Sequence, residues 1–252
     1  MSGNKFGGER LESASALSKN NLLEHLARYN LVESMSDGRV LDLGCGSGHG
    51  SKRLSEKFTK VTALDVSQQA LDYAKDNFFA TNIDYVLASG DKMPFEDNCF
   101  DTVVAFEVFE HVSNWRGLLS EIKRVAKPNS KIYISTPNKD LYSPGTSKPI
   151  NPHHAFEMTE SEFKAALKEF FILENFYGQR TPIYNDHWIW SIVNPILFAG
   201  KNIFSYKFNN TAKLKIINWI KPVLNENDIV FKADESFVKK SRFFLAVCKN
   251  NK

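Results

Sequence analysis

The chain has 252 residues, of which 42% are hydrophobic, and this length suits one elaborated domain with a full buried core. Its 32 basic and 29 acidic residues leave a formal net charge of +3, which is too balanced to indicate a nucleic-acid partner. The three cysteines, Cys45, Cys99 and Cys248, are odd in number and form no C-x-x-C pair, so neither a disulfide framework nor a zinc knuckle is indicated. We expect a soluble cytoplasmic protein, because no signal core or apolar run of transmembrane length is seen.

The N-terminal part of the chain is polar and then turns helical. Residues 1–14 are rich in glycine, serine and charge, which predicts a mobile arm. Leucines and other apolar residues then recur at helical spacing and predict a first helix over 16–34. Gly38 releases the chain from this helix into a short apolar strand.

A glycine-rich turn follows that strand, with the sequence Asp42-Leu43-Gly44-Cys45-Gly46-Ser47-Gly48. Glycine lacks a Cβ, so its backbone adopts positive φ readily and a ligand can lie directly against it, at the positive end of the next helix. The dinucleotide fingerprint G-x-G-x-x-G needs a third glycine where His49 stands. The pattern therefore predicts a nucleotide-type binding turn of a different kind.

Strands and helices alternate along the next part of the chain. Ser67 is placed to cap a helix over 68–79, and a second helix is expected over 114–126. Strands are expected over residues 60–65, 83–88, 100–108 and 131–135. This alternation predicts an α/β, Rossmann-like and mostly parallel sheet with helices on both faces, and ligands at the carboxyl ends of the strands.

The run D-x-G-x-G-x-G, with Asp65 ending the second strand, resembles the first motifs of class I S-adenosylmethionine-dependent methyltransferases. The resemblance implies a seven-stranded sheet, S-adenosyl-L-methionine as cofactor and S-adenosyl-L-homocysteine as product. It also implies that Asp65 takes the ribose hydroxyls, while Asp91 and Lys92 meet the adenine. The full set of cofactor-binding residues implied by motif match is Asp42, Gly44, Cys45, Gly46, Asp65, Val66, Asp91, Lys92 and Phe106.

A second informative stretch, E-x-x-E-H, ends the fourth strand, where the methyl group should point. Catalytic roles are expected for His111 and for His154 of a later H-x-F-E segment, because a neutral imidazole can take the acceptor's proton. A similar E-x-x-E-H with H-x-F-E occurs in metal-dependent small-RNA 2′-O-methyltransferases, so Glu107, Glu110, His111 and His154 are also a candidate metal set. The same string occurs in metal-free relatives such as ubiquinone-pathway O-methyltransferases. We favour the catalytic-histidine hypothesis, and a structural His111 stays open.

The acceptor is the part of the function that the sequence specifies least. Residues 135–179 resemble a branch of the superfamily associated with surface-polysaccharide assembly, which implies a small polar acceptor such as a sugar nucleotide or a phosphoethanolamine-like amine. Lys148, His153, His154 and Arg180 would give a positive rim that suits phosphate. An RNA 2′-O-methyltransferase, a NAD-linked oxidoreductase and a non-catalytic cofactor-binding protein are the alternatives. Nitrogen and oxygen acceptors both remain open.

The C-terminal part adds a helix, two strands and an insertion. Thr159 and Glu162 predict a capping box for a helix ending near Phe171. Strands are expected over 172–177 and 243–248, so a methyltransferase domain would span 1–179 and 241–252. The insertion, 180–240, is aromatic-rich with helical apolar runs. It is expected to form a lid, an acceptor-binding element or a homodimer interface, with a membrane-surface role as a minority hypothesis.

Overall fold

A computed structural model describes residues 16–35, 38–180 and 229–252. The expected N-terminal arm and most of the expected insertion lie outside these described residues. Within them, no helix has the length and apolar character needed to cross a membrane.

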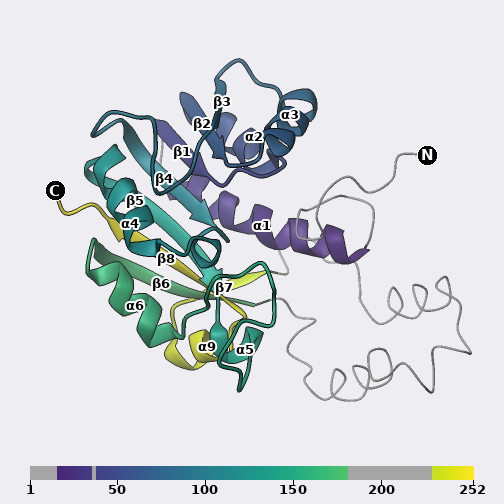
Figure 1. The fold of residues 1–252 in the computed structure, drawn as a ribbon, viewed down its shortest axis with the longest axis vertical. Coiled ribbons are helices and arrows are strands. Elements are labelled where there is room, and N and C mark those ends of the chain that lie inside the picture. Colours follow the sequence, from purple (N-terminus) through teal and green to yellow (C-terminus); the bar gives the residue numbers. More distant parts are fainter. Residues whose placement is uncertain (1–15, 36–37, 181–228) are drawn as a thin grey trace, which may run out of the picture.

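Among the described residues, one mixed sheet of eight strands, in the order β3-β2-β1-β4-β5-β8-β6-β7, forms the centre of the fold (Figure 1). The first five strands of this order, from β3 at the edge to β5, pair in parallel. Strand β8 is antiparallel to both β5 and β6. The strands are β1 (Arg39–Leu43), β2 (Lys60–Asp65), β3 (Ile83–Leu87), β4 (Phe100–Phe106), β5 (Ala126–Pro137), β6 (Ile172–Arg180), β7 (Val230–Lys232) and β8 (Phe243–Lys249). This confirms the expected α/β, Rossmann-like architecture.

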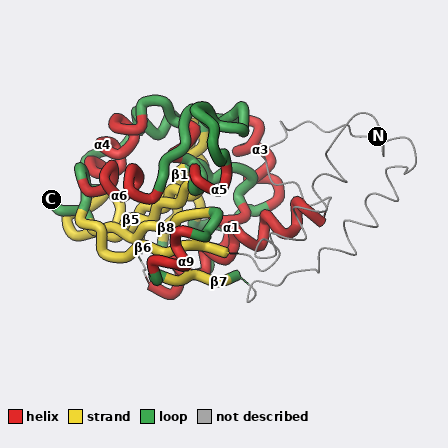
Figure 2. Tube along the Cα trace, turned by 90° about the horizontal axis from the view of Figure 1, so that it is seen from below, coloured by secondary structure: helices red, strands yellow, loops and turns green. Residues whose placement is uncertain are grey.

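Helices cover both faces of the sheet, as the tube view in Figure 2 shows. Side chains of a strand alternate between the faces, so Val103 and Ala105 of β4 join one core cluster, and Val104 and Phe106 the other. The first cluster includes residues of α4 and α6, and the second includes residues of α1, α2 and α3. The helices are α1 (Ala16–Met35), α2 (His49–Ser55), α3 (Gln68–Asn77), the short 3₁₀ helix η1 (Phe109–His111), α4 (Trp115–Val125), α5 (Lys139–Tyr142), α6 (Glu160–Lys168) and α9 (Glu235–Lys239).

Two helix starts follow the sequence signals. Ser67 accepts a hydrogen bond from the Ala70 backbone N–H at the start of α3. At α6 the capping box is complete, because the Thr159 side chain accepts from the Glu162 backbone and the Glu162 side chain accepts from the Thr159 backbone. Both predictions of helix capping are confirmed.

The described part of the chain has one strand more than the seven expected, because β7 lies inside the predicted insertion. Val230 and Phe231 are β-prone residues, and β7 pairs with the end of β6, with Arg180 opposite Val230. This pairing satisfies backbone groups that would otherwise form an open edge of β6. The chain therefore leaves the sheet at 180 and returns to a neighbouring position at 230, at the carboxyl edge of the parallel strands. The expected helical character of the insertion concerns mainly residues outside the described ranges.

Candidate active site

The glycine turn between β1 and α2 is held by backbone contacts to β2. The backbone N–H groups of Gly44 and Cys45 donate to the Leu64 carbonyl at 2.7 and 3.0 Å. Gly44 and Gly46 have φ values of +72° and +52°, which side-chain-bearing residues rarely adopt. A Cβ on Gly44 would lie 2.3 Å from Val108, whereas one on Gly46 would meet nothing within 4 Å. Gly46 therefore presents bare backbone to open space, as a ligand-binding turn requires.

Asp65 lies at the carboxyl end of β2, directly beside this turn. One carboxylate oxygen accepts from the Gly46 N–H at 2.9 Å, and the other accepts from the Ser67 N–H at 2.9 Å. The residue is 8% exposed and still contributes to the wall of the cleft. It therefore fixes the shape of the turn and offers oxygen atoms to a ligand.

Asp42 does not line the cleft, in contrast to our expectation. It is fully buried beneath the glycine turn, where it accepts hydrogen bonds from the Tyr29 hydroxyl at 2.9 Å and the Ser51 hydroxyl at 2.6 Å. Burial raises the pKa of Asp42 to about 6, although the two hydroxyl donors oppose the shift. Asp42 thus ties α1 and α2 to β1, and it acts on the site through the turn.

The cleft above the turn has a volume of about 980 Å³ and runs across the carboxyl ends of β1, β2 and β4. Lys92 is exposed and does not contribute to its wall, so its expected contact with adenine stays a prediction. Asp91 accepts hydrogen bonds from Ser89 and, at 3.5 Å, from Asn114. The predicted cofactor-binding residues that do line the cleft are Gly44, Cys45, Gly46, Asp65, Val66, Asp91 and Phe106.

Glu107 follows β4 and also lines the cleft, but its carboxylate is engaged elsewhere. Its backbone adopts φ +54°, which is uncommon for a residue other than glycine. The carboxylate accepts from the Ser135 hydroxyl at 2.7 Å and lies 3.4 Å from the buried Arg28 guanidinium of α1. Glu107 therefore joins α1 to the ligand edge of the sheet through an ion pair.

Glu110 is buried, with 1% of its surface exposed. Its carboxylate accepts from the Thr136 hydroxyl at 3.1 Å, and its backbone carbonyl accepts from the Ala155 N–H at 2.8 Å. Burial, assisted by the charge of Glu107, raises the pKa of Glu110 well above its usual value. These conditions favour the neutral carboxylic acid.

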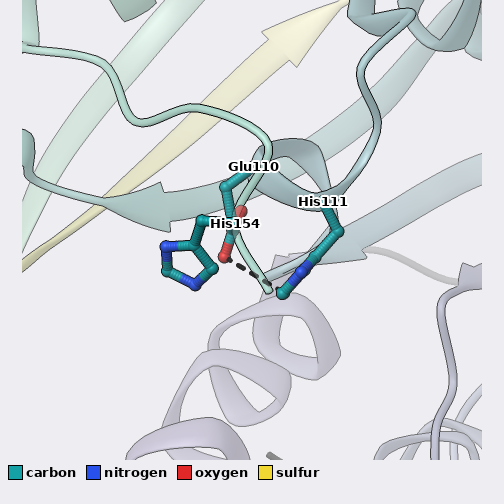
Figure 3. A group of neighbouring side chains, drawn as sticks. All are labelled: Glu110, His111 and His154. Atoms are coloured by element: carbon teal, nitrogen blue, oxygen red, sulfur yellow. Dashed lines mark ion pairs between the residues drawn. The ribbon is translucent and has the colours of Figure 1, made fainter. Parts of the chain in front are cut away.

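The two histidines expected to be catalytic do converge on one place, with their ring centres 5.0 Å apart. Figure 3 shows Glu110 between the two imidazoles. His111 donates from Nδ1 to the His153 carbonyl at 3.0 Å, since a carbonyl oxygen only accepts. Its Nε2 lies 4.0 Å from the Glu110 carboxyl. In neutral His111 the basic nitrogen is therefore Nε2.

His154 is more deeply buried and both its ring nitrogens are hydrogen-bonded. Nδ1 lies 2.7 Å from the Glu157 carboxylate, and Nε2 lies 3.0 Å from the Asn151 side-chain amide. It lines the same cleft as His111 but, of the two imidazoles, is the more constrained. The geometry thus favours His111 as the group that meets the acceptor.

A metal could be held by part of the expected set. Glu110, His111 and His154 each offer one ligand atom, and these atoms lie within 4.8 Å of one another. One carboxylate and two imidazoles suit zinc, iron or manganese, and an imidazole whose other nitrogen bonds an oxygen is typical of metal ligands. Glu107 is not part of this group, and its carboxylate pairs with Arg28 instead.

The acceptor end of the cleft contains residues that sequence reasoning missed. Arg242 immediately precedes β8, and its guanidinium lies 4.9 Å from the ring centre of Tyr142. Both residues line the cleft with His153, whereas Lys148 and Arg180 do not. Arg180 instead donates to the carbonyls of Ser236 and Phe237. The sheet places Arg242 here, because its neighbour Phe243 pairs with Pro137 at the end of β5.

This architecture defines a class: a doubly covered α/β domain whose nucleotide-type cleft lies over a glycine turn and an acidic strand end. Residues 41–134 match the family model described as "Methyltransferase domain". Over these residues, which make up less than half of the chain and include the glycine turn, the chain is similar to that family.

Relatives and solved structures agree with this match. The chain is 30% identical over 145 residues to a Mycolicibacterium smegmatis protein named "Probable S-adenosylmethionine-dependent methyltransferase", covering 57% of this chain and 56% of that protein. It is 34% identical over 113 residues to the ubiquinone biosynthesis O-methyltransferase of Dechloromonas aromatica, covering 42% and 47%. The chain thus spans about half the length of the curated relatives it matches.

The fold is similar to that of the N-methyltransferase NodS from Bradyrhizobium japonicum in complex with S-adenosyl-L-homocysteine. The TM-score is 0.57 at 13% identity, covering 92% of this chain and 87% of that one. The Dechloromonas aromatica relative is named an O-methyltransferase and NodS an N-methyltransferase, so similarity does not select the acceptor atom.

Proposed function

We propose that this protein transfers a methyl group from S-adenosyl-L-methionine to a nitrogen or oxygen atom of a small, polar, phosphate-bearing acceptor. The observation that carries the proposal is a single cleft with two chemically different ends. Gly46 and Asp65 form the end suited to a nucleoside cofactor, and His111 and Arg242 form the other.

S-adenosyl-L-methionine supplies an electrophilic methyl group on a sulfonium, which an acceptor lone pair attacks in line while the carbon–sulfur bond breaks. The residues of the cleft hold the reactants in that line, and orientation alone can recover roughly 7 to 11 kcal/mol of the barrier. His111 Nε2 takes the proton that an oxygen acceptor loses on attack. The buried Glu110 beside it favours the neutral form, so it does not compete as an anion.

The phosphate preference rests on the charge at the acceptor end. Arg242 offers a guanidinium that can bind phosphate through two parallel N–H groups. Tyr142 and His153 beside it add hydrogen-bonding groups in the same wall. A sugar nucleotide used in surface-polysaccharide assembly, or a phosphoethanolamine-like amine, has a phosphate and a methylatable atom within one small molecule.

A turnover screen tests this proposal. Sugar nucleotides and phosphorylated amines are incubated with the protein and the cofactor, each beside its dephosphorylated counterpart, and S-adenosyl-L-homocysteine is measured. We expect turnover only with phosphorylated acceptors, and Arg242→Gln should raise their KM about tenfold or more, the worth of one charge-assisted bond. Equal turnover of the dephosphorylated counterparts would contradict the phosphate preference.

A second candidate function, a metal-dependent RNA 2′-O-methyltransferase, is supported by the cluster of Glu110, His111 and His154. It predicts that a chelator abolishes turnover and that manganese restores it. Binding of the RNA acceptor to the protein would also weaken steeply as the salt concentration rises, since phosphate contacts release counterions. Activity that survives chelation would exclude this candidate.

We further propose that the insertion forms a lid, an acceptor-binding element or a homodimer interface. The pairing of Arg180 with Val230 allows residues 182–228 to be replaced by a short turn without altering the sheet. A lid or acceptor-binding element predicts a higher acceptor KM with unchanged cofactor affinity. An interface predicts a lower mass by light scattering.

A further inference from the structure

A chain of hydrogen bonds runs through the loop of residues 151–157, behind the two histidines. The Asn151 side-chain oxygen accepts from the His153 backbone N–H at 3.0 Å, and its amide nitrogen lies 3.0 Å from His154 Nε2. His154 Nδ1 lies 2.7 Å from the Glu157 carboxylate. The His153 carbonyl, in turn, is 3.0 Å from His111 Nδ1. The loop thus connects a buried carboxylate to the proposed base.

Elementary donor and acceptor rules fix the direction of each bond. A backbone N–H only donates, so the Asn151 oxygen must face His153 and its amide N–H groups must face His154. His154 Nε2 therefore accepts, and its proton resides on Nδ1, from which it is donated to Glu157. His111 Nδ1 likewise donates to the His153 carbonyl. Both imidazoles are held in the Nδ1–H tautomer.

Within the described residues, the hydrogen bond with His154 is the only one that the Glu157 side chain makes. Its side chain is 1% exposed, and the second carboxylate oxygen is buried without a hydrogen-bond partner. Burying a carboxylate with so little compensation costs stability. The contact with His154 is therefore the polar contact through which the Glu157 carboxylate can act.

We propose that Glu157 is a positioning residue for His111, acting through His154, Asn151 and the His153 backbone. The proposal rests on the proposed function, in which His111 Nε2 receives the acceptor's proton. Glu157 fixes the His154 tautomer, which fixes the Asn151 amide, which holds His153 so that its carbonyl takes the Nδ1 proton of His111. The loop is also tied directly to the segment that carries His111, because the Ala155 N–H donates to the carbonyl of Glu110, the residue before His111.

The isosteric variant Glu157→Gln tests the chain. If its amide nitrogen faces His154, two donors oppose each other and the His154 tautomer must change. If its amide oxygen faces His154, the NH₂ group is buried where the carboxylate oxygen has no partner. We expect kcat to fall about ten- to a hundredfold, the size of effect found when a partner that orients a metal-bound imidazole is removed, while cofactor affinity is unchanged.

Glu162→Gln is the matched control, because Glu162 lies five residues along the chain and caps α6, a role glutamine also fills. It should keep the wild-type kcat. Nitrogen-15 NMR of the imidazoles reads the tautomers directly. We expect Nδ1–H for His111 and His154 in the wild type and in Glu162→Gln. In Glu157→Gln we expect a changed His154 or His111 tautomer where the amide nitrogen faces His154.

Two results would overturn the proposal: an Nε2–H tautomer of His111 in the wild type, or equal kcat values for Glu157→Gln and Glu162→Gln. Failure of the proposed function looks different. In that case His111→Ala keeps its kcat, while the NMR spectra still show whether the hydrogen-bond chain exists.

Discussion

The two ends of the cleft are built in different ways. The cofactor end comes from one short stretch, Gly44 to Gly48, and from Asp65 nearby, and much of its geometry is backbone. The acceptor end is assembled from side chains far apart in the chain, such as His111, Tyr142 and Arg242. The cofactor end can therefore be predicted from local sequence, whereas the acceptor end depends on how the strands of the whole sheet are arranged.

The largest effect is expected at the backbone of the cofactor end. Gly46→Val should abolish cofactor binding by calorimetry, because its side chain would project into open space where a ligand must lie. Gly145→Val is the matched control: Gly145 also has positive φ, at +71°, and an open Cβ position, but it does not line the cleft. If both variants bind cofactor equally, the glycine turn is not the binding surface.

The acceptor end is tested most strongly at His111. His111→Ala should lower kcat about 10²- to 10⁴-fold, the usual contribution of a general base, without weakening cofactor binding. His154→Ala should also lower kcat, but less, because His154 acts through its neighbours. Steady-state kinetics with and without added manganese separate the two hypotheses, since metal should not restore either variant. Full activity of both variants would defeat the base assignment.

The next largest effect is expected at Asp65, whose side chain contacts the backbone of the cofactor end. Asp65→Ala removes the acceptor of the Gly46 and Ser67 N–H groups and the proposed partner of the ribose hydroxyls. We expect cofactor affinity to fall about ten- to a hundredfold, the worth of hydrogen bonds to a charged group. Asp84→Ala, an exposed aspartate of β3 outside the cleft, should leave it unchanged. Equal affinities in calorimetry would remove Asp65 from the site.

The same contrast explains what sequence could predict. The positions of the strands along the chain follow from local periodicity, and the helix caps from Ser67, Thr159 and Glu162, so both were predictable. The strand β7 was missed because its three residues gain their role only by pairing with Arg180 and its neighbours. Arg242 was missed because nothing near it in sequence marks a site. Conversely, Asp42 belongs to a recognisable motif, yet the motif does not say on which side of the turn its carboxylate lies.

The smallest expected effect concerns this buried Asp42 and the stability of the cofactor end. Its folded-state pKa of about 6 is above the 3.8 of an unperturbed aspartate, so the folded protein binds this proton more tightly than the unfolded chain. The stabilising contribution is therefore present at low pH and is lost as pH rises through about 6. Between pH 5 and 7 the loss should be about 1 kcal/mol of unfolding free energy, from the pKa difference. Urea unfolding of the cofactor-free protein measures it, and Asp42→Asn should remove this part of the slope because an amide does not titrate. A variant with the wild-type pH slope would show that Asp42 is not the titrating group, and that the acid beneath the turn is ionised in the folded protein throughout this range.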